Sequence, residues 1–191
     1  QQTDYLGILP RLSIDFRDNA LEPRFGAYFE LLPQFLWGLN SDSLNHLNLK
    51  SKLNAYLPLG SKLTLATSFL FWRIFRLNDG DGDVQCLSQL ADSDRNSPQV
   101  SNEVFCIPVN RRFFAGGRST IRGFLEQTLF PADQMGGAEE VSPGGMLMVA
   151  AKTELRFPVA KGVAGTVFFD IGDLYADPNS FAFDSLSQNS F

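Results

Sequence analysis

The sequence contains very little histidine and cysteine: one His and two Cys among 191 residues. A single histidine, His46, excludes metal sites that several histidines build together. Basic residues are also fewer than acidic ones, 16 against 21, which gives a net charge of −5. Proteins that bind nucleic acid neutralise phosphates with lysine and arginine, so this balance argues against a nucleic-acid partner.

Long apolar runs are also missing, and we expect no signal peptide in the opening residues. No stretch reaches the roughly 18 consecutive apolar residues that a membrane-spanning helix needs. The opening residues, QQTDYLGILPRL, have no basic segment followed by an apolar one, as a secretory signal would have. The last residues, SLSQNSF, show no clear stop, and we expect both ends to be cuts within a longer protein.

The strongest positive signal is a hydrophobic period of two. In residues 44–57 most odd positions, such as Leu47 and Leu49, are apolar, and most even positions, such as His46 and Lys50, are polar. Side chains of a strand alternate between its two faces, so this segment has one apolar and one polar face. The segments that we predict as strands are 5–17, 27–39, 44–57, 62–76, 146–157 and 163–175.

The lengths of these segments and of their connections favour a membrane barrel. Each segment has at least the roughly nine to eleven residues that a tilted strand needs to cross a bilayer. We expect tight turns at 58–60 and 158–162, whereas residues 77–145 form one long connection. Short turns at one end of the strands and long loops at the other are typical of outer-membrane barrels. We therefore predict an all-β fold: residues 1–191 form part of one antiparallel transmembrane β-barrel domain, with 77–145 as an extracellular loop.

A soluble β-sandwich is the alternative, because its strands also alternate. The barrel is favoured by the long strands, by the charges on one face and by the aromatic residues on the other. On the apolar face we expect Phe35, Trp37 and Phe71, with Tyr28 and Trp72 in an aromatic girdle near the strand ends. About six strands do not close a barrel, so we expect further strands outside this sequence.

Four motifs in order connect these strands to a known family. Residues 121–124 read IRGF and follow FFAGGRST, and the strands after the loop contain ELRFP at 154–158 and FFDIGDLY at 168–175. Upstream, residues 15–28 read DFRDNALEPRFGAY. These motifs resemble the Omp85 superfamily, which includes outer-membrane assembly factors, translocation-and-assembly barrels and the transporters of two-partner secretion. The resemblance covers most of residues 11–175 and implies the middle-to-late part of a barrel of about sixteen strands.

The resemblance also implies a role for the IRGF motif. In this family the loop folds into the lumen and its arginine pairs with acidic residues of the wall, which here implies Arg122 with Asp170, and Glu154 as a second partner. The alternation agrees, since it places both carboxylates on the polar face. A guanidinium binds carboxylates through parallel hydrogen bonds that lysine does not reproduce. We expect the loop glycines to adopt positive φ and Gly172 to leave room for the loop. The motif residues are Ile121, Arg122, Gly123 and Phe124.

The long connection carries two other features. Cys86 and Cys106 both lie in it, and because the cell surface is oxidising we expect a disulfide, with two free thiols as the alternative for a cytosolic protein. The acidic run NDGDGDV at 78–84 has the spacing of the first ligands of an EF-hand. Val84 replaces the required glycine and Leu90 the required glutamate, so we expect no metal site, although calcium binding stays open.

The resemblance implies a function without enzymatic chemistry or cofactors: insertion, assembly or translocation of other proteins at the bacterial outer membrane. His46 is the one histidine that could act as the base of a serine hydrolase, and the sequence has no Gly-x-Ser-x-Gly motif to supply the nucleophile. The implied partners are unfolded outer-membrane protein clients, the lipid bilayer, and periplasmic domains and accessory lipoproteins outside this sequence. Three alternatives stay open: a secretion pore for one dedicated partner, a barrel fused to a passenger enzyme, and a passive porin or ligand-binding barrel.

Overall fold

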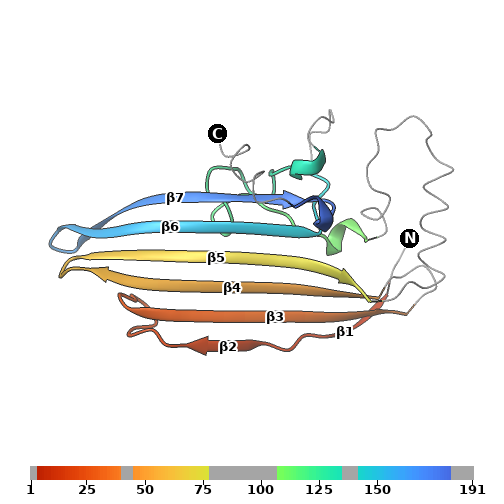
Figure 1. Cartoon of the computed structure of the whole chain (residues 1–191), viewed down its shortest axis with the longest axis horizontal. Coiled ribbons are helices and arrows are strands. Elements are labelled where there is room, and N and C mark those ends of the chain that lie inside the picture. The colour runs from red at the N-terminus through yellow and green to blue at the C-terminus, as the bar shows by residue number, and fades with distance from the viewer. Residues whose placement is uncertain (1–3, 40–44, 78–106, 135–141, 182–191) are drawn as a thin grey trace.

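The structure, a computed structural model, describes residues 4–39, 45–77, 107–134 and 142–181. Its main element is one antiparallel sheet of seven strands (Figure 1). The strands are β1 (Tyr5–Ile8), β2 (Leu12–Asp15), β3 (Gly26–Gly38), β4 (His46–Leu59), β5 (Leu63–Arg76), β6 (Leu147–Ala160) and β7 (Val163–Tyr175). Short 3₁₀ helices lie in the connections: η2 (Val109–Arg111), η3 (Ala132–Gln134) and η4 (Pro178–Ser180). Among the described residues, no helix is both long enough and apolar enough to cross a membrane.

Strands that follow one another in the chain are neighbours in the sheet, and the predicted all-β, antiparallel fold is confirmed. The order is β1–β3–β4–β5–β6–β7, with β2 also paired to β3. Short turns at Gly60 and Gly162, with φ of 84° and 79°, join β4 to β5 and β6 to β7. They lie at one end of the sheet, and the connection from β5 to β6 leaves from the other end (Figure 1). Pro58 and Pro158, predicted in the turns, instead lie in the last residues of β4 and β6, where a strand tolerates a missing N–H.

The first predicted strand, residues 5–17, is split in two. β1 pairs with residues 35–38 of β3, and β2 pairs with residues 28–31. Pro10 lies between them and has no N–H to donate to β3, so the ladder is interrupted there. The seven strands therefore occupy the positions of the six segments predicted from the sequence.

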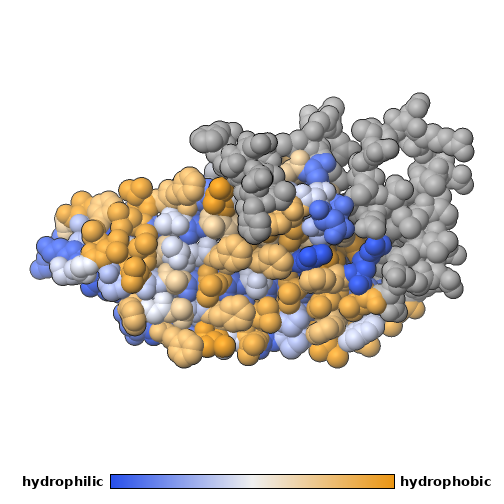
Figure 2. All heavy atoms as spheres, in the orientation of Figure 1, coloured by the Kyte–Doolittle hydropathy of each residue, from blue (hydrophilic) through white to orange (hydrophobic). Residues whose placement is uncertain are grey.

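The two faces of the sheet differ in composition. Paired residues share a face, and the register places even-numbered residues of β3 to β7 on one face and odd-numbered residues on the other. The odd face, which we call the apolar face, exposes large hydrophobic side chains such as Leu53, Phe69 and Phe169. Figure 2 shows hydrophobic side chains over much of the surface that it presents. The even face carries most of the polar residues, and we call it the loop face because residues 107–131 pack on it.

Two hydrophobic clusters show where the sheet is covered. On the loop face, Ile107, Phe113, Ile121 and Leu129 of the long connection belong to one cluster with residues of β5, β6 and β7. On the apolar face, a smaller cluster around Tyr175 at the long-connection end of β6 and β7 includes Ala132 and Phe181. Neither cluster contains a described residue of β3 or β4. The hydrophobic packing of the described connection is therefore concentrated on β5, β6 and β7, although the Phe113 ring also lies 5.4 Å from the Lys50 ammonium of β4.

Two aromatic residues lie on the face opposite to the one predicted. Trp72 and Tyr28 are even-numbered members of β5 and β3, so they point to the loop face and cannot belong to a girdle on the apolar face. Trp72 packs against Phe113, with ring centroids 5.6 Å apart. Phe35 and Trp37 do lie on the apolar face, where their rings stack at 6.2 Å. Parity along the strand, and not closeness to its end, decides which face an aromatic residue occupies.

Candidate functional site

The part of the long connection that packs on the sheet is tied together at its base. Arg112 is buried, and its guanidinium donates to the carbonyl oxygens of Ile107 and Pro143 at 2.9 and 3.0 Å. Phe113 and Gly145 exchange two backbone hydrogen bonds, of 2.9 and 2.8 Å. The two arms of the loop therefore meet just before β6.

Glycines shape the turn that precedes Arg122. Gly116 and Gly117 have φ of 111° and 81°, a conformation that L side chains rarely adopt. A Cβ on Gly116 would lie 2.2 Å from the carbonyl oxygen of Leu125, so the chain crosses itself too closely for any side chain. Gly123 differs, because its φ is not positive and a Cβ there would meet nothing within 4 Å. The expectation of positive φ is wrong for Gly123, and nothing in the structure explains this glycine.

Arg122 reaches both acidic residues of the wall. Its Nε and Nη2 donate to Oδ2 and Oδ1 of Asp170 at 2.7 and 2.6 Å, and its Nη1 donates to Oε1 of Glu154 at 2.7 Å. Its backbone N–H also donates to Oδ2 of Asp170, at 3.0 Å. Asp170 therefore holds both the side chain and the main chain of the loop, in the two-bond geometry that a guanidinium provides. Hydrogen bonding to Asp170 raises the pKa of Arg122 above its usual value, so this side chain is a permanent cation.

The strand register explains why one guanidinium reaches two carboxylates. In the β6–β7 ladder Lys152 pairs with Asp170 and Glu154 pairs with Phe168, so the two acidic residues are diagonal neighbours on one face. The Asp170 side chain is only 4% exposed, against 22% for Glu154. Two shielded carboxylates at this spacing require a cation between them, and the loop supplies it.

Two further residues complete the site and were not predicted. The guanidinium carbon of Arg122 lies 3.9 Å from the centroid of the Phe168 ring, a cation–π contact. Arg156 donates through Nε and Nη2 to Oε2 of Glu154 at 3.0 and 2.8 Å, so Glu154 offers one oxygen to each arginine. Both residues share parity with the acidic residues on their strands, and strict use of the alternation would have identified them.

The chain matches the Omp85 superfamily domain over residues 2–190. It belongs to the Omp85 superfamily. Among solved structures, this Omp85 chain is similar to BamA from Haemophilus ducreyi lacking POTRA domains 1–3, with a TM-score of 0.60 and 17% sequence identity. The match covers 86% of the Omp85 chain but only 29% of that BamA chain. None of the curated proteins matches it. The likeness shows the fold: the open sheet is the counterpart of part of the BamA barrel.

Gly172 of the Omp85 chain permits a close approach, although not the predicted one. A Cβ on Gly172 would lie 2.6 Å from both the Ala150 Cβ and the Val149 carbonyl oxygen. The atoms nearest to that Cβ all belong to β6, so the close approach that requires glycine is to the neighbouring strand and not to the loop.

The other predicted residues are not part of the bridge from Arg122 to Asp170 and Glu154. Ile121 is buried in the loop-face cluster, whereas Phe124 is 40% exposed. His46 is fully buried and meets the Tyr5 ring edge-on, with centroids 5.3 Å apart. Within the described part of the Omp85 chain, no group of three or more His, Cys, Asp or Glu could hold a metal. Cys86, Cys106 and the acidic run 78–84 lie outside the described residues.

Proposed function

We propose that this chain forms part of the wall of a barrel that inserts or translocates other proteins at the bacterial outer membrane. The apolar face contacts lipid and the loop face lines the lumen. The exposed hydrophobic side chains of the apolar face support this orientation, because soluble proteins rarely expose so extended an apolar surface. Membership of the Omp85 superfamily supports the function, with unfolded outer-membrane proteins as clients and with periplasmic domains and lipoproteins as partners.

The observation that carries the proposal is the bridge from Arg122 to Asp170 and Glu154. A loop fixed inside the lumen braces β6 and β7 from within, so that the wall keeps its shape while a client strand is added elsewhere. Client strands associate through backbone hydrogen bonds to an exposed strand edge, which requires no bond-breaking chemistry. In this proposal the protein is not an enzyme, and Arg122 stabilises the barrel wall without taking part in a reaction.

Client insertion by the full-length protein in proteoliposomes tests the proposal. Arg122→Ala leaves the shielded Asp170 carboxylate without its arginine and Glu154 with Arg156 alone, which costs about 3–5 kcal/mol in the docked loop. We expect the rate of client insertion to fall at least tenfold, where tenfold corresponds to about 1.4 kcal/mol, with partial recovery in Arg122→Lys. Arg118→Ala is the matched control, because the exposed Arg118 side chain makes no ion pair with a described residue.

Two outcomes contradict the proposal. If Arg122→Ala and Arg118→Ala insert clients at the same rate, the docked loop has no part in insertion. If the wild-type protein gives a large steady conductance across liposomes but inserts no client, the barrel is a passive pore. A single accepted client would instead identify a dedicated secretion pore, which narrows the function without changing the role of the wall.

A further inference from the structure

The charges on the loop face do not balance. Its acidic strand residues all pair with arginines: Asp15 with Arg17, Glu30 with Arg11, Glu154 with Arg122 and Arg156, and Asp170 with Arg122. Three lysines on the same face, Lys50, Lys52 and Lys152, form no ion pair with any described residue. Although the whole chain has a net charge of −5, the described residues of this face carry an excess of positive charge.

The three lysines differ in what else they contact. The Lys50 ammonium lies 5.0 and 5.4 Å from the ring centroids of Trp72 and Phe113, so aromatic faces partly replace its water. The Lys152 ammonium donates to the carbonyl oxygen of Arg118 at 3.1 Å and lies 3.5 Å from that of Ser119. Lys52 has neither kind of contact among the described residues and is exposed. Among the described residues it is therefore the one of these three lysines whose charge has no compensating contact.

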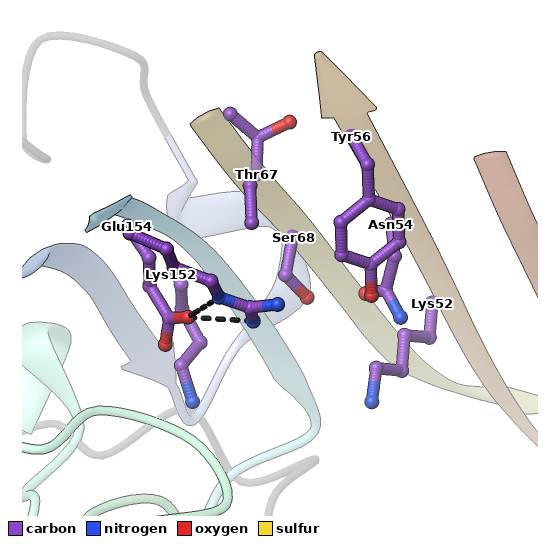
Figure 3. A pocket seen from close by; sticks show the side chains of 9 residues that line it. Lys52, Asn54, Tyr56, Thr67, Ser68, Lys152 and Glu154 are labelled. Atoms are coloured by element: carbon purple, nitrogen blue, oxygen red, sulfur yellow. Dashed lines mark hydrogen bonds and ion pairs between the residues drawn. The ribbon is translucent and has the colours of Figure 1, made fainter. Parts of the chain in front are cut away.

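Lys52 and Lys152 line the same depression on the loop face. The depression has a volume of about 180 Å³ and extends from β4 across β5 to β6 (Figure 3). Figure 3 shows the two lysines on opposite sides with Ser68 between them, and Asn54 beside Lys52. Liquid water occupies about 30 Å³ per molecule, so the depression holds several waters or one small anion.

The acidic residue that lines the depression does not cancel this charge. Glu154 already accepts hydrogen bonds from Arg122 through one oxygen and from Arg156 through the other. Arg156 also lines the depression, so its edge carries three cations against one carboxylate. A concave, low-dielectric wall concentrates such a field and raises the local concentration of ions of opposite charge.

We propose that this depression binds one oxyanion, a carboxylate or phosphate group, between Lys52 and Lys152. An ammonium binds an oxyanion as a compact point charge and has three N–H donors. Lys152 therefore keeps one donor when the other two point to the carbonyl oxygens of Arg118 and Ser119. The Ser68 hydroxyl and the Asn54 amide provide neutral donors at the same place. The site is distinct from the Arg122 bridge, because the bridge uses carboxylates of the wall and this site takes its anion from outside the chain. It does not depend on the proposed insertion function.

The test is a titration of the full-length protein in detergent micelles with inorganic phosphate at constant ionic strength, followed by the ³¹P line width. We expect saturable broadening with wild-type protein and an apparent affinity about tenfold weaker in Lys52→Gln, the loss of about one charge-assisted hydrogen bond. Lys52→Arg keeps the charge and is expected to keep binding. Lys161→Gln makes the same change of charge in the β6–β7 turn, outside the depression, and is expected to bind as wild type does.

The same titration distinguishes a carboxylate from a phosphate ligand and shows whether the proposed site exists. Displacement of phosphate by acetate identifies a site that also accepts carboxylates, whereas failure of acetate to compete identifies a phosphate site. Equal weakening in Lys52→Gln and Lys161→Gln, or broadening that never saturates, shows only a diffuse field and overturns the proposal. Heat-dependent migration on gels checks that each variant is folded, and Lys152→Gln replaces Lys52→Gln if the latter does not fold.

Discussion

The two halves of the loop face differ in how their charged side chains are paired and covered. Over β5 to β7 the face is covered by residues 107–131, and the carboxylates beneath the loop, Asp170 and Glu154, both bind Arg122. Over β3 and β4 the same face is not packed in either hydrophobic cluster, and Lys52 there has no ion pair with a described residue. Burial of a charge without a partner costs several kcal/mol, whereas a solvated charge needs no partner. The shielded carboxylates beneath the loop are therefore paired, whereas the exposed ammonium of Lys52 needs no partner and can face a ligand.

The largest effects are expected when the two carboxylates beneath the loop are replaced one at a time by the corresponding amides. Asp170 accepts three N–H bonds from Arg122 through two oxygens, whereas Glu154 accepts one bond from Arg122. An asparagine at 170 would offer one acceptor and turn an NH₂ group toward another donor. We expect Asp170→Asn to destabilise the docked loop by about 3 kcal/mol.

Glu154→Gln is the matched comparison, and we expect it to cost only about 1 kcal/mol, because Arg122 keeps Asp170 and the partly exposed Arg156 can turn to water. Hydrogen exchange of the backbone amides of residues 115–129 in the full-length protein measures both effects. If the two variants exchange at the same rate, Asp170 is not the principal anchor of the loop and the proposed hierarchy is incorrect.

A smaller effect should separate two glycines of the covered half. Gly116→Ala forces a Cβ against the Leu125 carbonyl oxygen at a φ of 111°, which we expect to cost about 1–3 kcal/mol. Gly123→Ala meets no atom within 4 Å and should change loop stability by less than about 0.5 kcal/mol. Limited proteolysis of the loop compares the two. Equal sensitivity would mean that the turn before Arg122 tolerates a side chain that this geometry forbids.

The sequence predicted the strands of the sheet well because alternation is a local property. Segments such as 62–76 and 163–175 differ from β5 and β7 by at most one residue at either end. The same parity places Asp170 and Glu154 on the polar face, and the order of motifs connects them to Arg122. Where parity was not applied strictly, the prediction failed, as for Trp72. The interruption at Pro10 was also missed, although a missing N–H is visible in the sequence.

The path of the loop could not be predicted in the same way. Ile107, Phe113 and Leu129 pack on the sheet, but a connection without regular structure has no period that would mark these residues as buried. The crossing at Gly116 depends on a contact with Leu125, and only the folded chain shows which glycines stand at such a crossing. The open depression at Lys52 is equally a property of the tertiary structure, since it combines residues of three strands.

The smallest expected effect lies at the end of the open half, in the turn from β2 to β3. The Asp18 carboxylate accepts hydrogen bonds from the backbone N–H groups of Arg24 and Phe25, at 3.0 and 3.1 Å. These bonds, that of Phe25 first, lower the pKa of Asp18 below its ordinary value. Because the pKa is lowered in the folded state, the stabilisation is complete above the ordinary carboxyl pKa of about 4 and is lost as the pH falls through the lowered value.

Amide exchange of Arg24 and Phe25 in the full-length protein, measured as the pH is lowered, checks this. After correction for the intrinsic pH dependence of exchange, protection should fall in acid in the wild type, and Asp18→Asn should be less protected at neutral pH and insensitive to acid. The amides beneath the Arg122 loop serve as the internal reference for the covered half. A wild-type turn that keeps its full protection in strong acid would show that the carboxylate charge of Asp18 is not what holds it. The turn would then owe its order to backbone geometry alone, as at Gly26, where a φ of 108° and the Phe16 carbonyl oxygen 2.1 Å from a Cβ position leave room only for glycine.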